Sequence, residues 1–239
     1  MSGSITVPES WRGLDAKALL RAVLKQRTLK VAVTSSFGAE SAVLLDLVAR
    51  IDPATPIIFV DTGRLFDETL AYRDRLVRHL DLLDVRTVTP GAALVDNVDP
   101  DGTLYQSDPD ACCQARKVTP YAMAVSGFDV LITGRKRHHG DVREDLEVFE
   151  QAGRHLKVNP LAHYGATDIE AALARRKLPR HPLADAGYPS IGCAPCTHKS
   201  CPSRGVRSGR WSGAAKTECG IHTTFDLKFQ SLKFQSLGV

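Results

Sequence analysis

The chain has 239 residues, of which 43% are hydrophobic and 24% charged, with a formal net charge of +4 at pH 7. This size and composition suit one large α/β domain and exclude a chain that is disordered throughout. The mild positive charge suits an anionic small molecule and is weaker than a nucleic-acid-binding protein needs. The sequence shows neither a secretory signal nor an apolar run near the roughly 18 residues of a bilayer span. We therefore expect a cytoplasmic protein that binds neither nucleic acid nor membrane.

The first part of the chain alternates between strand and helix patterns. Residues 29–34 form a short β-branched run that predicts a strand, and residues 39–50 have the apolar spacing of a buried helix. Residues 56–61 predict a second buried strand, which is followed by a helix from about 65 to 80. Further strands are predicted at 85–89, 129–134 and 156–158.

Near-continuous apolar strands separated by helices indicate a parallel sheet with helices on both faces, which is a Rossmann-like α/β fold. Ligands of such sheets bind beyond the carboxyl ends of the strands. The loops expected around one crevice are residues 35–41, 61–64 and 134–143.

The regular pattern ends near Leu183, where Gly, Pro, Cys, Ser and Arg become frequent. We therefore divide the chain into an α/β domain over 1–205 and a C-terminal segment over 206–239. The tail holds two identical pentapeptides in tandem, at 228–232 and 233–237, which are too short for a solenoid. We expect this tail to be a mobile or weakly docked extension.

A candidate anion-binding loop lies between the first predicted strand and helix, with the sequence Ser35-Ser36-Phe37-Gly38-Ala39-Glu40-Ser41. Gly38 would let the backbone approach a ligand closely, and the helix start would present N–H groups and a favourable partial charge to an anion. An ordinary turn with a serine helix cap is the alternative. The loop is not a Walker motif, because no Gly-Lys-Ser/Thr follows.

Four of the six cysteines form two close pairs, Cys112-Cys113 and Cys193-x-x-Cys196. Cytosolic cysteines point to metal binding or catalysis rather than to disulfides. Two adjacent side chains converge with difficulty on one zinc ion, whereas an iron–sulfur cluster spreads its ligands over several irons. The spacing favours a cluster and leaves zinc, redox dithiols or inert core cysteines as alternatives. Cys201 has no partner of evident spacing, and we treat it as structural or accidental.

Cys219 stands apart from these pairs, in the segment Lys216-Thr-Glu-Cys219-Gly-Ile-His222. Nearby cations favour the reactive thiolate, and three arginines precede this segment at 204, 207 and 210. Cys219 is thus a candidate nucleophile. A free surface thiol is the alternative.

The loop at 35–41 matches the Ser-x-Gly-x-Asp/Glu-Ser pattern of the PP-loop family, and Val60-Asp61-Thr62-Gly63-Arg64 resembles that family's second signature. Further motifs follow in order: 112–117, Gly134-Arg-Lys-Arg137, 188–197 and 207–222. Together they resemble the assimilatory adenylyl-sulfate reductases, which belong to the sulfonucleotide reductases. The resemblance covers roughly residues 28–222 and implies a PP-loop fold, similar to adenine nucleotide α-hydrolases.

The resemblance implies that Cys219 attacks the sulfur of adenylyl sulfate, releases AMP and becomes an S-sulfocysteine. A thioredoxin or glutaredoxin-type dithiol would then release sulfite, in sulfate assimilation. It also implies a [4Fe–4S] cluster on Cys112, Cys113, Cys193 and Cys196, a feature that accompanies use of adenylyl sulfate rather than its 3′-phosphorylated form. The sequence is compatible with a homo-oligomer and does not fix the oligomeric state.

The matching positions predict the residues that bind the substrate. For the arginines of this set, the alternative is a solvated basic face. For its histidine, the alternative is an ordinary surface position. The predicted set comprises Ser35, Ser36, Phe37, Gly38, Glu40, Ser41, Asp61, Thr62, Gly63, Lys117, Arg135, Arg137, Arg143, Arg207, Arg210 and His222. The stretch His138-His139-Gly140-Asp141 departs from the family, in which a Gln- or Ser-rich stretch is expected.

Three other functions were weighed. The nearest is the same chemistry on 3′-phosphoadenylyl sulfate. A PP-loop iron–sulfur transferase acting on tRNA would call for a nucleic-acid-binding extension and a stronger positive charge. An iron–sulfur sensor that binds nucleotides without catalysis would leave Glu218-Cys219-Gly220 and its basic surroundings unexplained.

Overall fold

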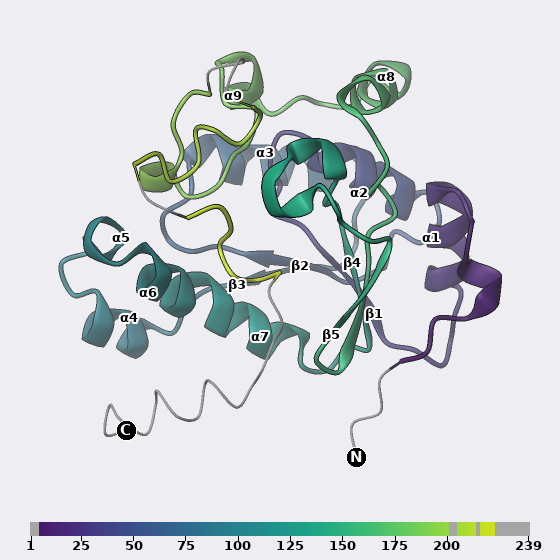
Figure 1. The fold of residues 1–239 in the computed structure, drawn as a ribbon, viewed down its shortest axis with the longest axis horizontal. Coiled ribbons are helices and arrows are strands. Elements are labelled where there is room, and N and C mark those ends of the chain that lie inside the picture. The colour runs from purple at the N-terminus through teal and green to yellow at the C-terminus, as the bar shows by residue number, and fades with distance from the viewer. Residues whose placement is uncertain (1–4, 201–204, 214–215, 223–239) are drawn as a thin grey trace.

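The computed structural model describes residues 5–200, 205–213 and 216–222 (Figure 1). Cys201, Arg204 and the tandem repeat lie outside these ranges, so the expectations for them, including the mobile tail, stay predictions. The proposed boundary at 205/206 adjoins an undescribed stretch and is likewise untested. No helix within the described ranges is long and apolar enough to cross a membrane.

The described part of the chain forms a six-stranded sheet in the order β3-β2-β1-β4-β6-β5. Five strands are mutually parallel, and β5 runs antiparallel to β6 at one edge. The strands are β1 (Val31–Thr34), β2 (Ile57–Val60), β3 (Val85–Val88), β4 (Val130–Thr133), β5 (Phe149–Ala152) and β6 (His155–Val158).

Helices cover both faces of the sheet, as expected for apolar parallel strands (Figure 1). Val33 and Ile132 enter the larger core, with α1 (Ala16–Leu24), α2 (Ser41–Ala49), α3 (Asp67–His79) and α8 (Ala166–Arg176). The alternate positions Ala32 and Leu131 point to the other face and pack against α7 (Thr119–Val125). The predicted Rossmann-like class is confirmed.

Shorter elements complete the described chain. The helices α6 (Pro109–Cys113) and α7 are joined by a π-helical turn, η2 (Gln114–Val118), so that the helical backbone continues from Pro109 to Val125. A π turn inside a helix is rare and is frequently associated with a functional site. The remaining elements are η1 (Glu9–Trp11), α4 (Ala92–Val98), α5 (Leu104–Ser107), η3 (Arg137–His139), η4 (Asp141–Arg143), α9 (Pro182–Asp185) and η5 (Ala194–Cys196).

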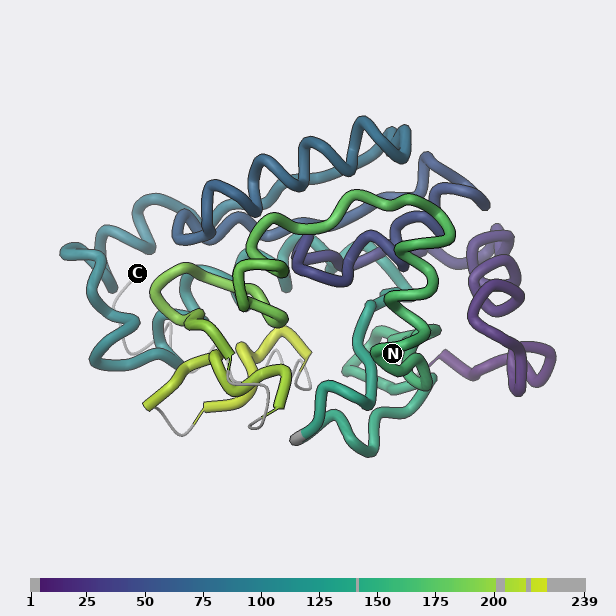
Figure 2. Tube along the Cα trace, turned by 90° about the horizontal axis from the view of Figure 1, so that it is seen from above, coloured from purple at the N-terminus to yellow at the C-terminus, as the bar shows by residue number. Residues whose placement is uncertain are grey.

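The order of strands creates one crevice. The chain builds outward from β1 to β3 and then crosses to β4 on the other side of β1. Loops leave the carboxyl ends of β1 and β4 in opposite directions there, which is where doubly wound sheets bind ligands. Viewed from above, the described residues 205–213 and 216–222 lie beside the segment around 190–200 (Figure 2).

A buried histidine beside α9 gives a prediction for stability. His181 is fully buried, its Nδ1 accepts a hydrogen bond from the Leu183 amide at 3.1 Å, and its Nε2 lies 3.1 Å from Thr69 Oγ1. Burial lowers the pKa of His181 to about 4. An unfolded histidine titrates near pH 6.5, so the unfolded state binds more protons between about pH 6.5 and 4. The free energy of unfolding should therefore fall as pH falls through this window, by up to about 3 kcal/mol from this residue.

Urea unfolding of wild type and His181→Gln at pH 7, 5.5 and 4.5 measures that contribution. Glutamine can both accept and donate but does not titrate, so the variant should lose less stability on acidification. Equal pH slopes for the two proteins would contradict the prediction.

Candidate active site

A pocket opens at the carboxyl ends of β1 and β4. Its walls are the loop after β1, the loop after β4, the segment 189–192 and the C-terminal residues up to His222. The predicted residues among its lining are Ser35, Ser36, Gly38, Glu40, Ser41, Lys117, Arg135, Arg143, Arg207, Arg210, Cys219 and His222. Residues from positions 35 to 222 thus share one site.

Phe37 takes a different place from its loop neighbours. Its side chain is fully buried and meets Phe59 edge-on, with 5.3 Å between ring centroids. Its backbone has φ of 48°, a left-handed conformation that is uncommon for a residue with a side chain. The Ser35 hydroxyl accepts a hydrogen bond from the Phe37 amide at 3.1 Å. Phe37 therefore anchors the loop in the core, and only its backbone can serve a ligand.

Two other predicted groups face away from this pocket. The Arg137 Nε donates to the Leu146 carbonyl at 2.8 Å. Asp61 accepts a hydrogen bond from the Gly63 amide at 2.9 Å and so closes a tight turn in which Gly63 has φ of 67°. This turn directs Thr62 toward the cysteines, because Thr62 Oγ1 lies 3.2 Å from Cys193 Sγ.

The C-terminal residues bring Cys219 into the pocket, where it is only 9% exposed. The neighbouring Glu218 carboxylate accepts a hydrogen bond from Arg143 Nε at 2.5 Å and lies 3.5 Å from Arg207 Nη2. Burial raises the pKa of Glu218, but Arg143 and Arg207 outweigh it and lower the pKa. Burial lowers the pKa of Arg207 to about 10, with Arg143 adding to the effect. The Glu218 carboxylate thus offsets part of the positive charge of the neighbouring guanidinium groups.

Several buried nitrogens at this site have no hydrogen-bond partner among the described residues: Arg210 Nε, Trp211 Nε1 and His222 Nδ1. An unsatisfied buried donor costs about 1–3 kcal/mol, so such groups indicate a missing ligand. Burial, followed by Arg135 and Lys157, lowers the pKa of His222 well below its usual value. The Lys157 Nζ donates to the His222 carbonyl at 3.1 Å and ties the segment to β6.

A second, smaller cavity holds both cysteine pairs. Cys112 and Cys113 end α6, Cys193 precedes η5, and Cys196 is the last residue of η5. None of the described cysteines forms a disulfide. Lys117, Arg210 and Trp211 line both cavities, so the cysteines and the pocket of Cys219 share walls.

Another group of potential metal ligands lies outside this cavity. Within the described residues, Glu40, His138 and His139 each offer a ligand atom, and these atoms lie within 4.8 Å of one another.

A buried ion pair supports the smaller cavity. The Arg116 guanidinium pairs with Asp99 at 2.7 Å and donates through Nη1 to the Thr62 carbonyl at 3.3 Å. Sequence reasoning did not assign roles to Asp99, Arg116, Lys157 or Glu218. For Lys157 a signal existed, since a charged residue interrupts an apolar strand. For Glu218 the signal was its place beside the candidate nucleophile.

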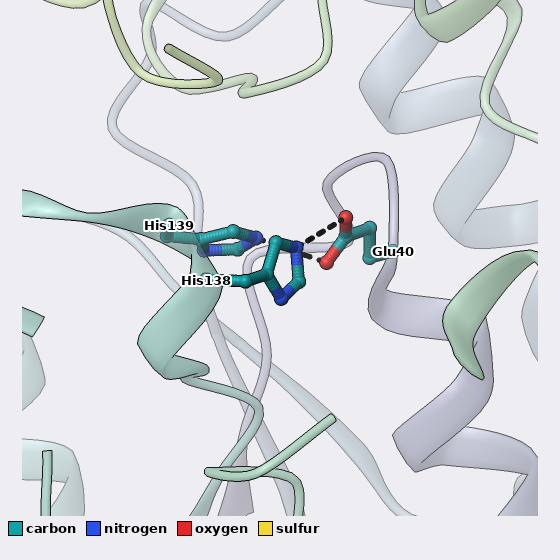
Figure 3. Close-up of side chains that lie close together, drawn as sticks. All are labelled: Glu40, His138 and His139. Carbon is teal, nitrogen blue, oxygen red and sulfur yellow. Dashed lines mark hydrogen bonds and ion pairs between the residues drawn. The ribbon is translucent and has the colours of Figure 1, made fainter. Parts of the chain in front are cut away.

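Glu40 points sideways to the loop after β4 (Figure 3). Its Oε2 lies 3.0 Å from His139 Nε2 and 2.7 Å from Lys136 Nζ, and its Oε1 lies 3.4 Å from His138 Nε2. Burial raises the pKa of Glu40, yet the His139 hydrogen bond and Lys136 lower it far below its usual range. Glu40 is therefore a carboxylate that joins the loops after β1 and β4.

The sequence and the fold match known proteins. Residues 30–199 match the model of the phosphoadenosine phosphosulfate reductase domain. An adenosine 5′-phosphosulfate reductase of Mesorhizobium japonicum is 48% identical over 193 residues, covering 81% of this chain and 76% of that protein. A phosphoadenosine 5′-phosphosulfate reductase of Gloeobacter violaceus is 36% identical over 217 residues, covering 89% and 90%.

A solved structure supports the fold. The phosphoadenylyl-sulfate reductase of Candida auris, crystallised with phosphate, has a TM-score of 0.68 at 23% identity and covers 82% of this chain and 100% of that one. The match of the domain model to most of the chain and the identity to reductases over most of their length agree with the site described above. The chain therefore belongs to the family of adenosine 5′-phosphosulfate and phosphoadenosine 5′-phosphosulfate reductases, which are oxidoreductases.

Proposed function

We propose that this protein reduces adenylyl sulfate to sulfite and AMP in sulfate assimilation, with thioredoxin or a glutaredoxin-type protein as the reductant. One observation carries the proposal: a buried Cys219 shares a pocket with the loop after β1 and with Arg143, Arg207 and Arg210. A nucleophile, an anion-binding loop and several guanidinium groups are what transfer of a sulfonyl group from a nucleotide requires.

In the first step, the Cys219 thiolate attacks the sulfur of adenylyl sulfate. A bond forms between Sγ and the substrate sulfur, the bond from that sulfur to the bridging oxygen breaks, and AMP leaves with the electron pair. In the second step, a thiolate of the reductant attacks Cys219 Sγ and releases sulfite, and the second thiol of the reductant resolves the mixed disulfide. The dithiol supplies both electrons and Cys219 is regenerated.

The pocket contributes alignment and charge. Arg143, Arg207 and Arg210 are suited to the sulfate, because a guanidinium donates two parallel hydrogen bonds to such an oxyanion. The loop after β1 would hold the phosphate of the nucleotide near the start of α2. Lys117 lines the same pocket and can offset charge on the departing AMP.

The two cysteine pairs fit a [4Fe–4S] cluster, which we propose they bind. The fit rests on their sharing one cavity and on the unpartnered Trp211 Nε1 in the wall of that cavity. When bound, the cluster would supply a fixed charge beside Lys117, and no electron from it is needed. The first step uses residues of this chain alone, and the second uses Cys219 and the dithiol of the reductant.

The preference for adenylyl sulfate over its 3′-phosphorylated form is tested by sulfite release. Purified protein with thioredoxin and dithiothreitol should show a specificity constant for adenylyl sulfate at least about 100-fold higher than for the phosphorylated nucleotide, which corresponds to about 3 kcal/mol. A preference for the phosphorylated form would leave a reductase with the other substrate. Absence of sulfite from both would overturn the proposal.

A further inference from the structure

Arg143, one of the proposed sulfate-binding residues, is held from two sides. Its Nε donates to Glu218 Oε1 at 2.5 Å, and its Nη1 lies 3.2 Å from His139 Nδ1. Arg143 is 8% exposed, so these contacts are made in a largely dehydrated setting. Glu218 lies on the same segment as Cys219, which must leave the pocket when the reductant reaches that cysteine. His139 lies in η3, in the loop after β4, and is not part of that segment.

The hydrogen bonds of His139 fix its protonation and tautomer. A guanidinium only donates, so His139 Nδ1 must be the accepting, unprotonated nitrogen. The proton then sits on Nε2, which donates to Glu40 Oε2 at 3.0 Å (Figure 3). Burial, together with Lys136 and Arg143, outweighs the Glu40 hydrogen bond and lowers the pKa of His139 to about 4. The imidazole is thus neutral near pH 7, with one donor and one acceptor both in use.

The same geometry does not suit a metal ion, although Glu40, His138 and His139 lie close enough to hold one. An imidazole that binds a metal through Nε2 carries its proton on Nδ1 and needs an acceptor there. Here Nδ1 of His139 faces the donor Arg143, and the ammonium of Lys136 already lies 2.7 Å from Glu40 Oε2. The side chains of Arg143 and Lys136 therefore already occupy the positions that a metal ion would need.

His138 provides an internal comparison. Its Nδ1 lies 2.7 Å from the Tyr164 carbonyl, and its Nε2 lies 3.4 Å from Glu40 Oε1. It thus lies near Glu40 without a hydrogen bond to it, and its described hydrogen bond goes to the backbone and not to Arg143.

We propose that His139 is a positioning residue that orients Arg143 toward the sulfate of the substrate and keeps it oriented while Glu218 moves. This inference rests on the proposed function, since it concerns the same sulfate. Two hydrogen bonds in series, from Glu40 to His139 and from His139 to Arg143, also connect the loop after β1 to the proposed sulfate-binding arginine. Glutamine offers the same pair of an acceptor and a donor.

The test compares three variants: His139→Leu, His139→Gln and His138→Leu. His139→Leu should lower kcat/KM for adenylyl sulfate by about 10- to 100-fold, which is the range expected when a charged hydrogen-bond donor loses its alignment. Its Kd for AMP, which has no sulfate, should change less than about 3-fold, a shift below the value of one neutral hydrogen bond. His139→Gln should restore activity to near the wild-type level, and His138→Leu should stay near it.

Four results would overturn the inference. His139→Leu could weaken the binding of AMP as much as it lowers kcat/KM for adenylyl sulfate, as a merely structural role predicts. It could reduce activity further in an Arg143→Ala background, where a residue acting through Arg143 adds nothing. His139→Gln could fail to rescue, or wild type could hold stoichiometric zinc that His139→Leu lacks. A wild type that releases no sulfite from adenylyl sulfate would instead refute the proposed function.

Discussion

Replacing Cys219 by serine should abolish sulfite release, with a loss of at least about 10⁴-fold. The thiolate is the nucleophile, and a serine hydroxyl at the same place is almost never ionised near neutral pH. The substitution removes one sulfur atom from a 9% exposed position and leaves the arginines in place. The variant should therefore still bind AMP. Sulfite release by the standard assay and AMP binding by calorimetry measure the two effects.

The matched control is Cys112→Ser, which alters a cysteine of the other cavity. This variant should lose the iron of the proposed cluster, whereas Cys219→Ser should keep it. Mass spectrometry adds a direct readout, because wild type incubated with adenylyl sulfate and no reductant should gain one sulfonate and Cys219→Ser none. Undiminished sulfite release by Cys219→Ser would refute the role of this residue.

Asp99→Ala should destabilise the protein by about 3–5 kcal/mol, the usual cost of leaving one member of a buried ion pair alone. The side chains of Asp99 and Arg116 are 2% and 9% exposed, so water does not compensate for the lost partner. The substitution should also disturb the position of Cys193. Arg116 donates to the Thr62 carbonyl, and the Thr62 hydroxyl contacts Cys193. Urea unfolding and iron content per chain measure the two consequences.

The double variant Asp99→Leu, Arg116→Met serves as the control for this prediction. Apolar side chains of similar length leave no buried charge unpaired, and such replacements often restore stability. The double variant should therefore be more stable than Asp99→Ala. If Asp99→Ala were as stable as wild type, the pair would contribute little to folding.

Much of the sheet could be predicted from the sequence, because its inner strands are apolar on both faces. β1, β2 and β4 fall inside the predicted runs 29–34, 56–61 and 129–134. The edge strand β5 was not predicted, since Phe149–Ala152 contains Glu150 and Gln151 and shows no apolar run. The other edge strand, β3 (Val85–Val88), falls inside the predicted run 85–89, because it begins and ends with valine.

Topology alone predicts which loops lie together, whereas the direction of each side chain does not follow from a motif. The loops after β1 and β4 were expected to meet, and they line one pocket. A motif cannot reveal that Phe37 turns into the core or that Arg137 donates to Leu146, because backbone φ and packing decide both. The role of His139 is hidden for the same reason, since it depends on which nitrogen faces Arg143.

The pairing of β1 with β4 also has a consequence for how the chain folds. These neighbours join Val31–Thr34 to Val130–Thr133, and the two cysteine pairs are likewise far apart in sequence, at 112–113 and 193–196. Contacts between distant residues form slowly, because the entropy of closing a long loop must be overcome first. We therefore expect the crevice and the four thiols to assemble after the local helices. The proposed cluster would need both pairs of cysteines at once, so it would be loaded only when the fold is nearly complete.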